Sequence, residues 1–81
     1  MQATFEISLY PLSEQYEKIV LEFLADLNEY NDITVETNGM STQVFGELDH
    51  VFPILQELSK IYMEKYAAIL VMKVGKGHLR Y

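Results

Sequence analysis

Two stretches of the chain, residues 2–10 and 40–47, alternate polar and apolar side chains. Successive side chains of an extended chain point to opposite sides, so the polar members of each stretch share one side. That side carries a carboxylate, hydroxyls, an amide and aromatic rings: Glu6, Ser8, Tyr10, Ser41, Gln43 and Phe45. Burying such polar groups is costly unless partners satisfy them. They therefore either pair with a second protein surface or receive a small ligand.

The chain offers little for catalysis. It has no cysteine, which excludes disulfides and a thiolate nucleophile. Of its two histidines, His50 falls in the first turn of a predicted helix and His78 in the tail, so neither is placed beside a serine as a base. Neither forms a metal-ligand pair with spaced carboxylates, and no glycine-rich phosphate loop precedes a helix. We therefore expect a protein that is not an enzyme and that uses no metal or cofactor.

The composition limits the possible partners. A chain of 81 residues is expected to form one domain, residues 1–81. Twelve Asp and Glu against six Lys and Arg give a net charge of −6, the wrong sign for a surface that binds nucleic acid. No apolar run is long enough to span a bilayer, and residues 1–6 lack the pattern of a signal peptide. We expect no nucleic-acid partner, no membrane insertion and a cytoplasmic location.

The first polar stretch leads into a helical pattern. A strand is predicted over residues 2–10 and ends at Pro11, which cannot donate to a sheet. An amphipathic helix is predicted next, from an N-cap at Ser13 to about Tyr30. Its apolar positions have the spacing of one helical face: Tyr16, Ile19, Val20, Phe23, Leu24 and Leu27. This face should cover the apolar side of the strand.

The second polar stretch belongs to a predicted hairpin. Its Asn38-Gly39 pair lies between two alternating runs and indicates a two-residue type I′ turn, in which Thr37 faces Met40 and Val35 faces Thr42. One side of this hairpin is then expected in the core: Ile33, Val35, Thr37, Met40, Thr42 and Val44. The other side is polar with one large aromatic ring: Thr34, Glu36, Ser41, Gln43, Phe45 and Glu47.

The rest of the chain completes a known topology. A second helix is predicted from an N-cap at Asp49, with Pro53 near its start, and a last strand over residues 67–74. Residues 75–81 form a basic, glycine-punctuated tail that we expect to be flexible. The order βαββαβ predicts an α+β, ferredoxin-like fold, a four-stranded antiparallel sheet with two helices on one face. Its usual strand order, 4-1-3-2, places the first and third strands in the centre.

The last predicted strand is apolar on both sides. Leu70 and Met72 share one side, and Ile69 and Val71 share the other. A strand with two apolar sides is usually covered on both, whereas the helices of this fold cover only one. We therefore expect a second copy of the chain to cover the open face, in a homo-oligomer that is a dimer or a tetramer.

Three motifs, in their order and spacing, make the whole chain similar to a known family. They are Ser8-Leu9-Tyr10-Pro11-Leu12, Met40-Ser41-Thr42 followed by Val44 and Gly46, and Val74-Gly75-Lys76-Gly77. With them the chain resembles the YkoF-like family of small ferredoxin-like proteins that bind thiamine or hydroxymethylpyrimidine. The resemblance implies non-enzymatic binding of thiamine or its hydroxymethylpyrimidine moiety, in vitamin B1 transport or salvage. Members with two such repeats bury their open sheet faces against each other, so a chain with one repeat would do this between subunits.

The resemblance also implies a set of ligand-binding residues. An aminopyrimidine has an exocyclic amine donor, two ring-nitrogen acceptors and a flat π face, so its pocket needs an acceptor, hydroxyl or backbone donors and an aromatic or methionine wall. Residues on or near two adjacent strands supply these types: Glu6, Ser8, Tyr10, Asn38, Met40, Ser41, Thr42, Gln43 and Phe45. The alternative is a regulatory or interaction module, similar to ACT domains, that only dimerises through its sheet face.

Overall fold

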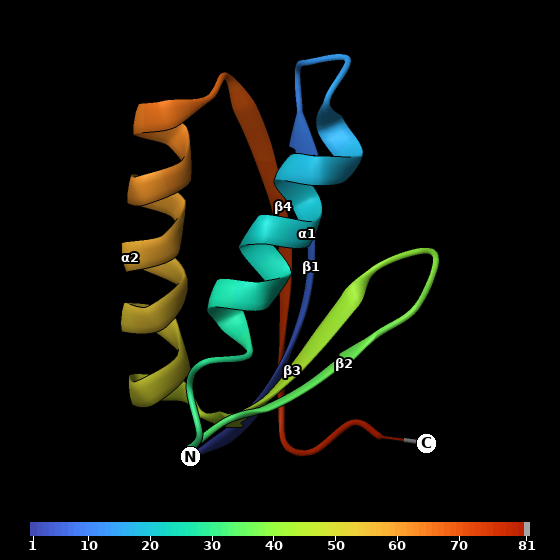
Figure 1. Ribbon diagram of the computed structural model, residues 1–81. Coiled ribbons are helices and arrows are strands. Elements are labelled where there is room, and N and C mark those ends of the chain that lie inside the picture. The colour runs from blue at the N-terminus through green and yellow to red at the C-terminus, as the bar shows by residue number, and fades with distance from the viewer. Residues whose placement is uncertain (81) are drawn as a thin grey trace.

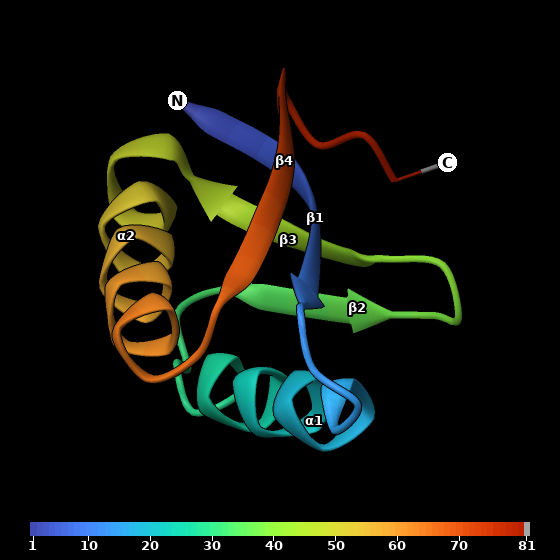
Figure 2. The same cartoon turned by 90° about the horizontal axis from the view of Figure 1, so that it is seen from above.

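A computed structural model describes residues 1–80 and has the predicted order of elements (Figure 1). The elements are β1 (Gln2–Pro11), α1 (Tyr16–Leu27), β2 (Thr34–Thr37), β3 (Thr42–Glu47), α2 (Leu48–Lys65) and β4 (Ala68–Lys76). The strands form one antiparallel sheet in the order β2-β3-β1-β4, so β1 and β3 are central. Both helices pack on the same face of this sheet (Figure 2). The predicted ferredoxin-like α+β fold is therefore confirmed.

The hydrophobic core lies between the two helices and one face of the sheet. On the central strands, Phe5, Ile7 and Val44 point to this face and are at most 2% exposed. Phe23 of α1 and Leu55 of α2 belong to the same cluster. Burying one such side chain contributes about 1.5–3 kcal/mol, which fixes the side of each strand that faces the helices. The polar residues between them are consequently placed on the opposite, open face.

α1 is shorter than predicted at both ends. Its N-cap is Gln15 and not Ser13, whose hydroxyl instead accepts a hydrogen bond from the Gln15 backbone N–H at 3.0 Å. At the other end the Asn28 side chain donates to the Leu24 carbonyl at 2.7 Å, and the helix stops before Tyr30. Short polar side chains that hydrogen-bond to nearby backbone compete with helix formation. The spacing of apolar residues, on which the prediction rests, does not reveal such bonds, so the predicted helix is too long at both ends.

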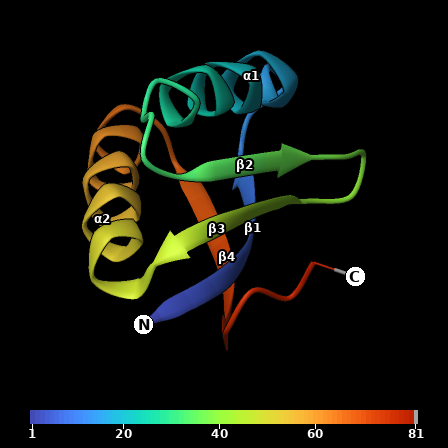
Figure 3. The same cartoon turned by 90° about the horizontal axis from the view of Figure 1, so that it is seen from below.

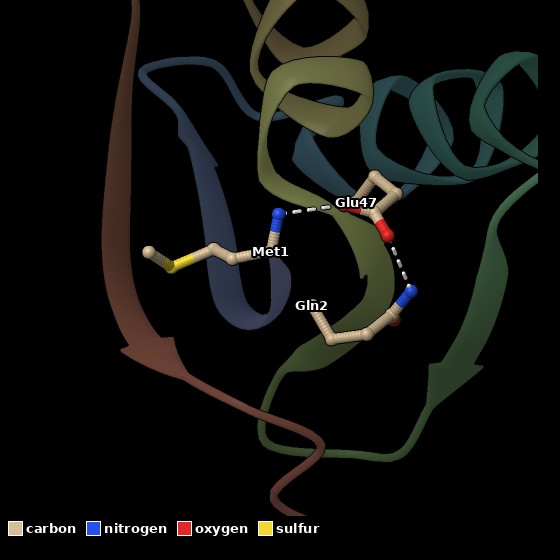
Figure 4. A network of polar contacts seen from close by, with 3 residues as sticks. All are labelled: Met1, Gln2 and Glu47. Carbon is tan, nitrogen blue, oxygen red and sulfur yellow. Dashed lines mark hydrogen bonds and ion pairs between the residues drawn. The ribbon is translucent and has the colours of Figure 1, made fainter.

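α2 begins two residues earlier than predicted, because Glu47 and not Asp49 occupies the N-cap position. The Glu47 side chain makes no capping bond. Its carboxylate accepts hydrogen bonds from the amino group of Met1 at 2.8 Å and from the amide of Gln2 at 3.0 Å (Figure 4). These contacts hold the pKa of Glu47 below its ordinary value and raise the pKa of the amino group. Within residues 1–80, neither helix is long and apolar enough to cross a membrane.

The hairpin of β2 and β3 has a different register from the one predicted. Thr37 pairs with Thr42 and not with Met40, so the connection is the four-residue loop 38–41. Neither residue of the Asn-Gly pair has the positive φ that a type I′ turn requires. Because side chains alternate with a period of two, this shift leaves the strand residues on their predicted faces. Met40, however, leaves the expected core side and is 87% exposed in the loop.

β4 is an edge strand with apolar side chains exposed on both sides. Ile69 and Val71 are half-exposed on the open face, and Met72 and Val74 are exposed on the helix side. α2 packs more extensively against β3 than against β4, which leaves this edge uncovered. The two-sided apolar character predicted from the sequence is therefore present, and the strand continues to Lys76, two residues beyond its predicted end.

Candidate functional site

The sheet opens into a cleft where β1 and β3 separate. Their pairing ends at Ile7 and Thr42, and beyond this point β1 pairs with β4 alone as far as Pro11. The hairpin tip diverges from β1, as Figure 1 shows. A central strand thus loses one neighbour for its last four residues, and side chains from three elements border the space.

A cavity of about 430 Å³ occupies this cleft. It is bordered by residues 7–9 of β1, by α1 and by hairpin residues 37–42. α1 supplies mainly apolar groups to its wall: Val20, Leu21, Phe23 and Leu24. Cavities of roughly 300–1,000 Å³ with apolar walls and a few polar groups are typical of small-molecule sites. The cleft therefore has the size and composition of a binding site for a small organic molecule.

Polar groups beside the cleft are connected across the strands. The Ser41 hydroxyl donates a hydrogen bond to the Glu6 carboxylate at 3.1 Å, and the other oxygen of that carboxylate lies 3.5 Å from the Lys73 ammonium on β4. The hydroxyls of Thr37 and Thr42 are 3.0 Å apart. The Glu6 side chain keeps 40% of its surface exposed, so the carboxylate can still accept a hydrogen bond from a bound molecule.

Asn38 organises the loop that carries Ser41. Its side-chain oxygen accepts hydrogen bonds from the backbone N–H groups of Met40 at 2.8 Å and Ser41 at 3.1 Å. Its own backbone N–H donates to the Ser41 carbonyl at 3.0 Å. An Asn side chain that bonds backbone two and three residues ahead substitutes for a turn with positive φ. Asn38 thus fixes where the Ser41 hydroxyl lies relative to Glu6.

The structure divides the predicted site residues among four places. One group lines the cleft cavity: Ser8, Asn38, Met40, Ser41 and Thr42. Glu6 and Gln43 are direct cross-strand neighbours and line a smaller hollow of about 340 Å³ on the open face. Tyr10 is exposed opposite Ile69, at the far end of β1. Phe45 lies on the open face as predicted but is only 3% exposed.

The chain after β4 is what covers Phe45. The His78 imidazole stacks on the Phe45 ring with centroids 4.8 Å apart and planes inclined by 25°. The Arg80 guanidinium lies 5.2 Å from the centroid of the same ring and pairs with the Glu36 carboxylate. Figure 3 shows this segment on the side of the sheet away from α1. The expectation of a flexible tail thus overlooked these contacts, although Phe45, a large apolar ring on a polar face, was a signal that something covers it.

A third cavity, of about 400 Å³, lies beside the covered ring. Its wall includes Phe45, His78, His50 and Asp32. The Asp32 carboxylate pairs with His50, and this hydrogen bond lowers the pKa of Asp32. Over the part of the chain that the structure describes, no three potential metal ligands converge. Asp32 and His50 are thus paired with each other, and Glu47, the other carboxylate of this wall, is paired with the amino group of Met1.

A larger hollow, with a volume of about 680 Å³, lies on the outer side of α1. Its wall comes from one segment of the chain: Gln15, Glu17, Lys18, Leu21 and Glu22. A single helix cannot enclose a ligand from several sides, and enclosure is what gives small-molecule sites their affinity. The smaller cleft between β1 and the hairpin, walled by three elements, is the better candidate.

The profile of one protein family, described as the YKOF-related family, matches residues 2–75. No curated protein sequence matches the chain. The family match covers all six elements apart from the last residue of β4.

Several solved structures have the same fold. A candidate thiamine biosynthesis/salvage protein from Thermotoga maritima superposes with a TM-score of 0.86 at 15% identity, covering 95% of this chain and 85% of that one. A protein from Streptococcus pneumoniae gives a TM-score of 0.87 at 20% identity, covering 98% and 90%. A hypothetical protein from Methanocaldococcus jannascii gives 0.80 at 22% identity, covering 99% and 84%. At these identities the likeness establishes the fold alone.

Proposed function

The chain belongs to the YKOF-related family, and from this premise we propose that it binds thiamine or its hydroxymethylpyrimidine moiety without converting it. The binding site would be the cleft between β1 and the hairpin together with the adjoining open face around Glu6. The observation that carries the proposal is the Ser41–Glu6 hydrogen bond of 3.1 Å beside a cavity of about 430 Å³. A similar fold in a candidate thiamine biosynthesis/salvage protein supports the same class of ligand.

The groups at the cleft suit an aminopyrimidine. The Glu6 carboxylate can accept from the exocyclic amine, and the Ser8 hydroxyl can donate to a ring nitrogen. The Ser41 hydroxyl, which donates its proton to Glu6, can only accept from the ligand. The apolar wall, with Leu21 from α1 and Met40 from the loop, offers contact to a flat ring. In small-molecule sites a few polar groups usually fix the orientation of the ligand, while a mainly apolar wall buries it.

The charge of the protein suits the other half of thiamine. The thiazolium ring carries a positive charge, and the chain has a net charge of −6. A negative field raises the local concentration of a cation and speeds its association. Lys73 beside Glu6 is 81% exposed and can move away, which would leave the carboxylate free for the ligand.

We also propose that the protein works as a homo-oligomer in the cytoplasm, in vitamin transport or salvage. The support for an oligomer is the exposure of apolar side chains on both sides of β4, Ile69 and Val71 on the open face among them. Exposed apolar residues that gather on one strand mark an interaction surface. A second copy on this face would also narrow the access to Glu6.

Calorimetric titration with thiamine and, separately, with hydroxymethylpyrimidine tests the proposal. We expect saturable heat with at least one of them, and a melting temperature that rises with ligand concentration, because a ligand that binds the folded state stabilises it. Nicotinamide, a flat heterocycle without the aminopyrimidine pattern, is the control. Absence of heat and of any melting shift with both ligands at high micromolar concentration would contradict the proposal.

A second candidate is an interaction module, similar to ACT domains, that only dimerises through its sheet face. The observation that favours it is that the polar groups of the open face already pair within the chain, as Glu6 does with Ser41 and Lys73. Both candidates predict an oligomer. They differ in the melting experiment, where a pure interaction module shows no shift with either vitamin compound.

A further inference from the structure

The chain turns back across the open face after β4, and we call residues 77–80 the tail strap. Gly77 has φ of +88°, a left-handed conformation that favours glycine, and it redirects the chain. Its backbone N–H donates to the Gln2 carbonyl at 2.8 Å. The strap thus begins at a defined turn, and Figure 2 shows it on the side of the sheet away from both helices.

One side chain of β1 anchors the strap. The Thr4 hydroxyl donates to the Gly77 carbonyl and accepts from the Leu79 backbone N–H, each at 2.8 Å. The Leu79 side chain packs over Gly75, where an added Cβ would come within 2.7 Å of it. These contacts place the side chains of His78 and Arg80 above Phe45.

The strap also separates two hollows of the open face. His78 forms part of the wall of the cavity of about 400 Å³ beside Phe45. Leu79, the next residue, forms part of the wall of the hollow of about 340 Å³ that contains Glu6 and Gln43. If the strap moves off the sheet, the two hollows join along β3 into one groove from Glu6 to Phe45.

The groups that the strap places on Phe45 are both flat and rich in nitrogen. His78 contributes an aromatic heterocycle in stacking geometry, and Arg80 a planar cation whose charge is met by Glu36. Aromatic rings bind such groups through their faces. The surface formed by Phe45 and Glu36 is therefore suited to a planar, positively charged nitrogen heterocycle.

The strap is held lightly compared with the core. His78, Leu79 and Arg80 are all exposed, and the strap has no apolar side chain in the buried cluster. Segments with few buried apolar contacts open at low free-energy cost. A molecule that binds to the open face can therefore displace the strap.

We propose that the tail strap occupies, within the same chain, a binding surface for a planar cationic heterocycle, and that such a ligand must displace His78 and Arg80 to stack on Phe45. This inference rests on the proposed function in taking thiamine as the natural example of the ligand class. The apparent affinity is then the intrinsic affinity multiplied by the fraction of molecules in which the strap is open.

The test compares wild type with the double variant His78→Ala/Arg80→Ala, which keeps Gly77, Thr4 and the Leu79 anchor. Thiamine is titrated by calorimetry, and N-methylpyridinium, a simple flat cation, is titrated while the Phe45 ring protons are followed by NMR. Loss of one stacking and one cation–π contact predicts roughly 5- to 50-fold tighter binding of thiamine to the double variant.

Two single variants serve as controls. Lys76→Ala removes one positive charge just before the strap, so it reports any gain that comes from net charge alone. His78→Phe retains a ring on Phe45 and should bind thiamine as wild type does. If Lys76→Ala gains as much as the double variant, or if His78→Phe gains as much, the strap does not act by covering Phe45.

The outcomes separate this inference from the proposed function. Equal or weaker thiamine binding by the double variant overturns the strap inference and leaves the proposed function standing. If thiamine gives no heat with either protein, the titration with hydroxymethylpyrimidine decides the proposed function, and N-methylpyridinium decides the strap inference. If the Phe45 protons then shift at a lower N-methylpyridinium concentration in the double variant than in wild type, the strap inference is supported. If the two proteins respond equally, or neither responds, the strap inference is overturned.

Discussion

Ser41 and Glu6, 35 positions apart in the chain, are joined by a hydrogen bond of 3.1 Å that crosses from the hairpin loop to β1. The bond lies where the pairing of β1 with β3 has just ended. A carboxylate held by a hydroxyl at the edge of a cavity is preorganised, because its position is already fixed before a ligand binds. This relationship links the fold to the proposed binding of an aminopyrimidine.

Replacing the pair should weaken binding without harming the fold. In Glu6→Gln/Ser41→Ala, the ligand loses a charged acceptor and a hydroxyl, and each charge-assisted hydrogen bond lost costs about 1.5–3 kcal/mol. We expect thiamine affinity to fall about tenfold or more by calorimetry. The melting temperature should change little, because both side chains are partly exposed.

A matched control is available on α2. Glu57→Gln/Ser59→Ala changes the same residue types on the second helix, away from the cleft lining. It should bind thiamine as wild type does. If the two double variants lose affinity equally, or if Glu6→Gln/Ser41→Ala fails to fold, the polar pair has a structural role and not a ligand-binding one.

Asn38 should matter through the loop that it organises. Asn38→Ala removes the acceptor for the backbone N–H groups of Met40 and Ser41, which should cost about 1 kcal/mol of unfolding free energy. Thiamine affinity should also fall several-fold, because the Ser41 hydroxyl is no longer held against Glu6. Asn38→Asp keeps an acceptor oxygen and should restore most of both. Denaturant unfolding and calorimetry measure the two effects, and an Asp variant no better than Ala would contradict this role.

The sequence predicted the topology because the alternation and the helical spacing are strong over every element. It did not predict the hairpin turn, because the side chain of Asn38 supplies hydrogen bonds that make a four-residue loop possible without positive φ. The wrong turn did not change the face on which each strand residue lies, since the register shift is two residues. It mattered for Met40, whose place in the core depended on the shorter turn.

The alternation of polar and apolar residues also predicted part of the candidate site. Glu6 and Ser41 were placed correctly on one face by alternation, and the structure adds the contact between them. The cleft itself could not be predicted, because it depends on where the pairing of β1 and β3 ends. The tail strap was missed because glycine-rich basic ends are usually free, and its anchor is a hydroxyl of Thr4 more than 70 positions away.

The two carboxylates with lowered pKa predict how stability depends on pH. His50 lowers the pKa of Asp32 below 3.8, and the contacts with Met1 and Gln2 lower that of Glu47 below 4.5. A lowered folded-state pKa gives stability that is present above the unfolded value and is lost as the pH falls through the folded value. The melting temperature should therefore drop when the pH is lowered from about 5 to about 3.

Replacing both carboxylates should make the melting temperature depend less on pH. Asp32→Asn/Glu47→Gln cannot lose these interactions on protonation, so its melting temperature should start lower at neutral pH and fall less in acid than that of wild type. Both groups are exposed, so the difference should be small but measurable by calorimetry. Glu57→Gln, an exposed carboxylate on α2, serves as the control. Parallel pH profiles for the double variant and wild type would show that these pairs contribute nothing to stability.

A charge placed on the open side of β4 should dissociate the proposed oligomer. Val71 is half-exposed there, and Val71→Lys would bury an unpaired ammonium in the interface between copies. Such a charge costs roughly 3–5 kcal/mol, which corresponds to a loss of association of roughly 100-fold or more. Met63→Lys, at an exposed apolar position of α2, is the matched control and should leave the oligomer intact. Sedimentation measures both, and a monomeric wild type, or a Val71→Lys protein that sediments as wild type does, would rule out assembly through this face.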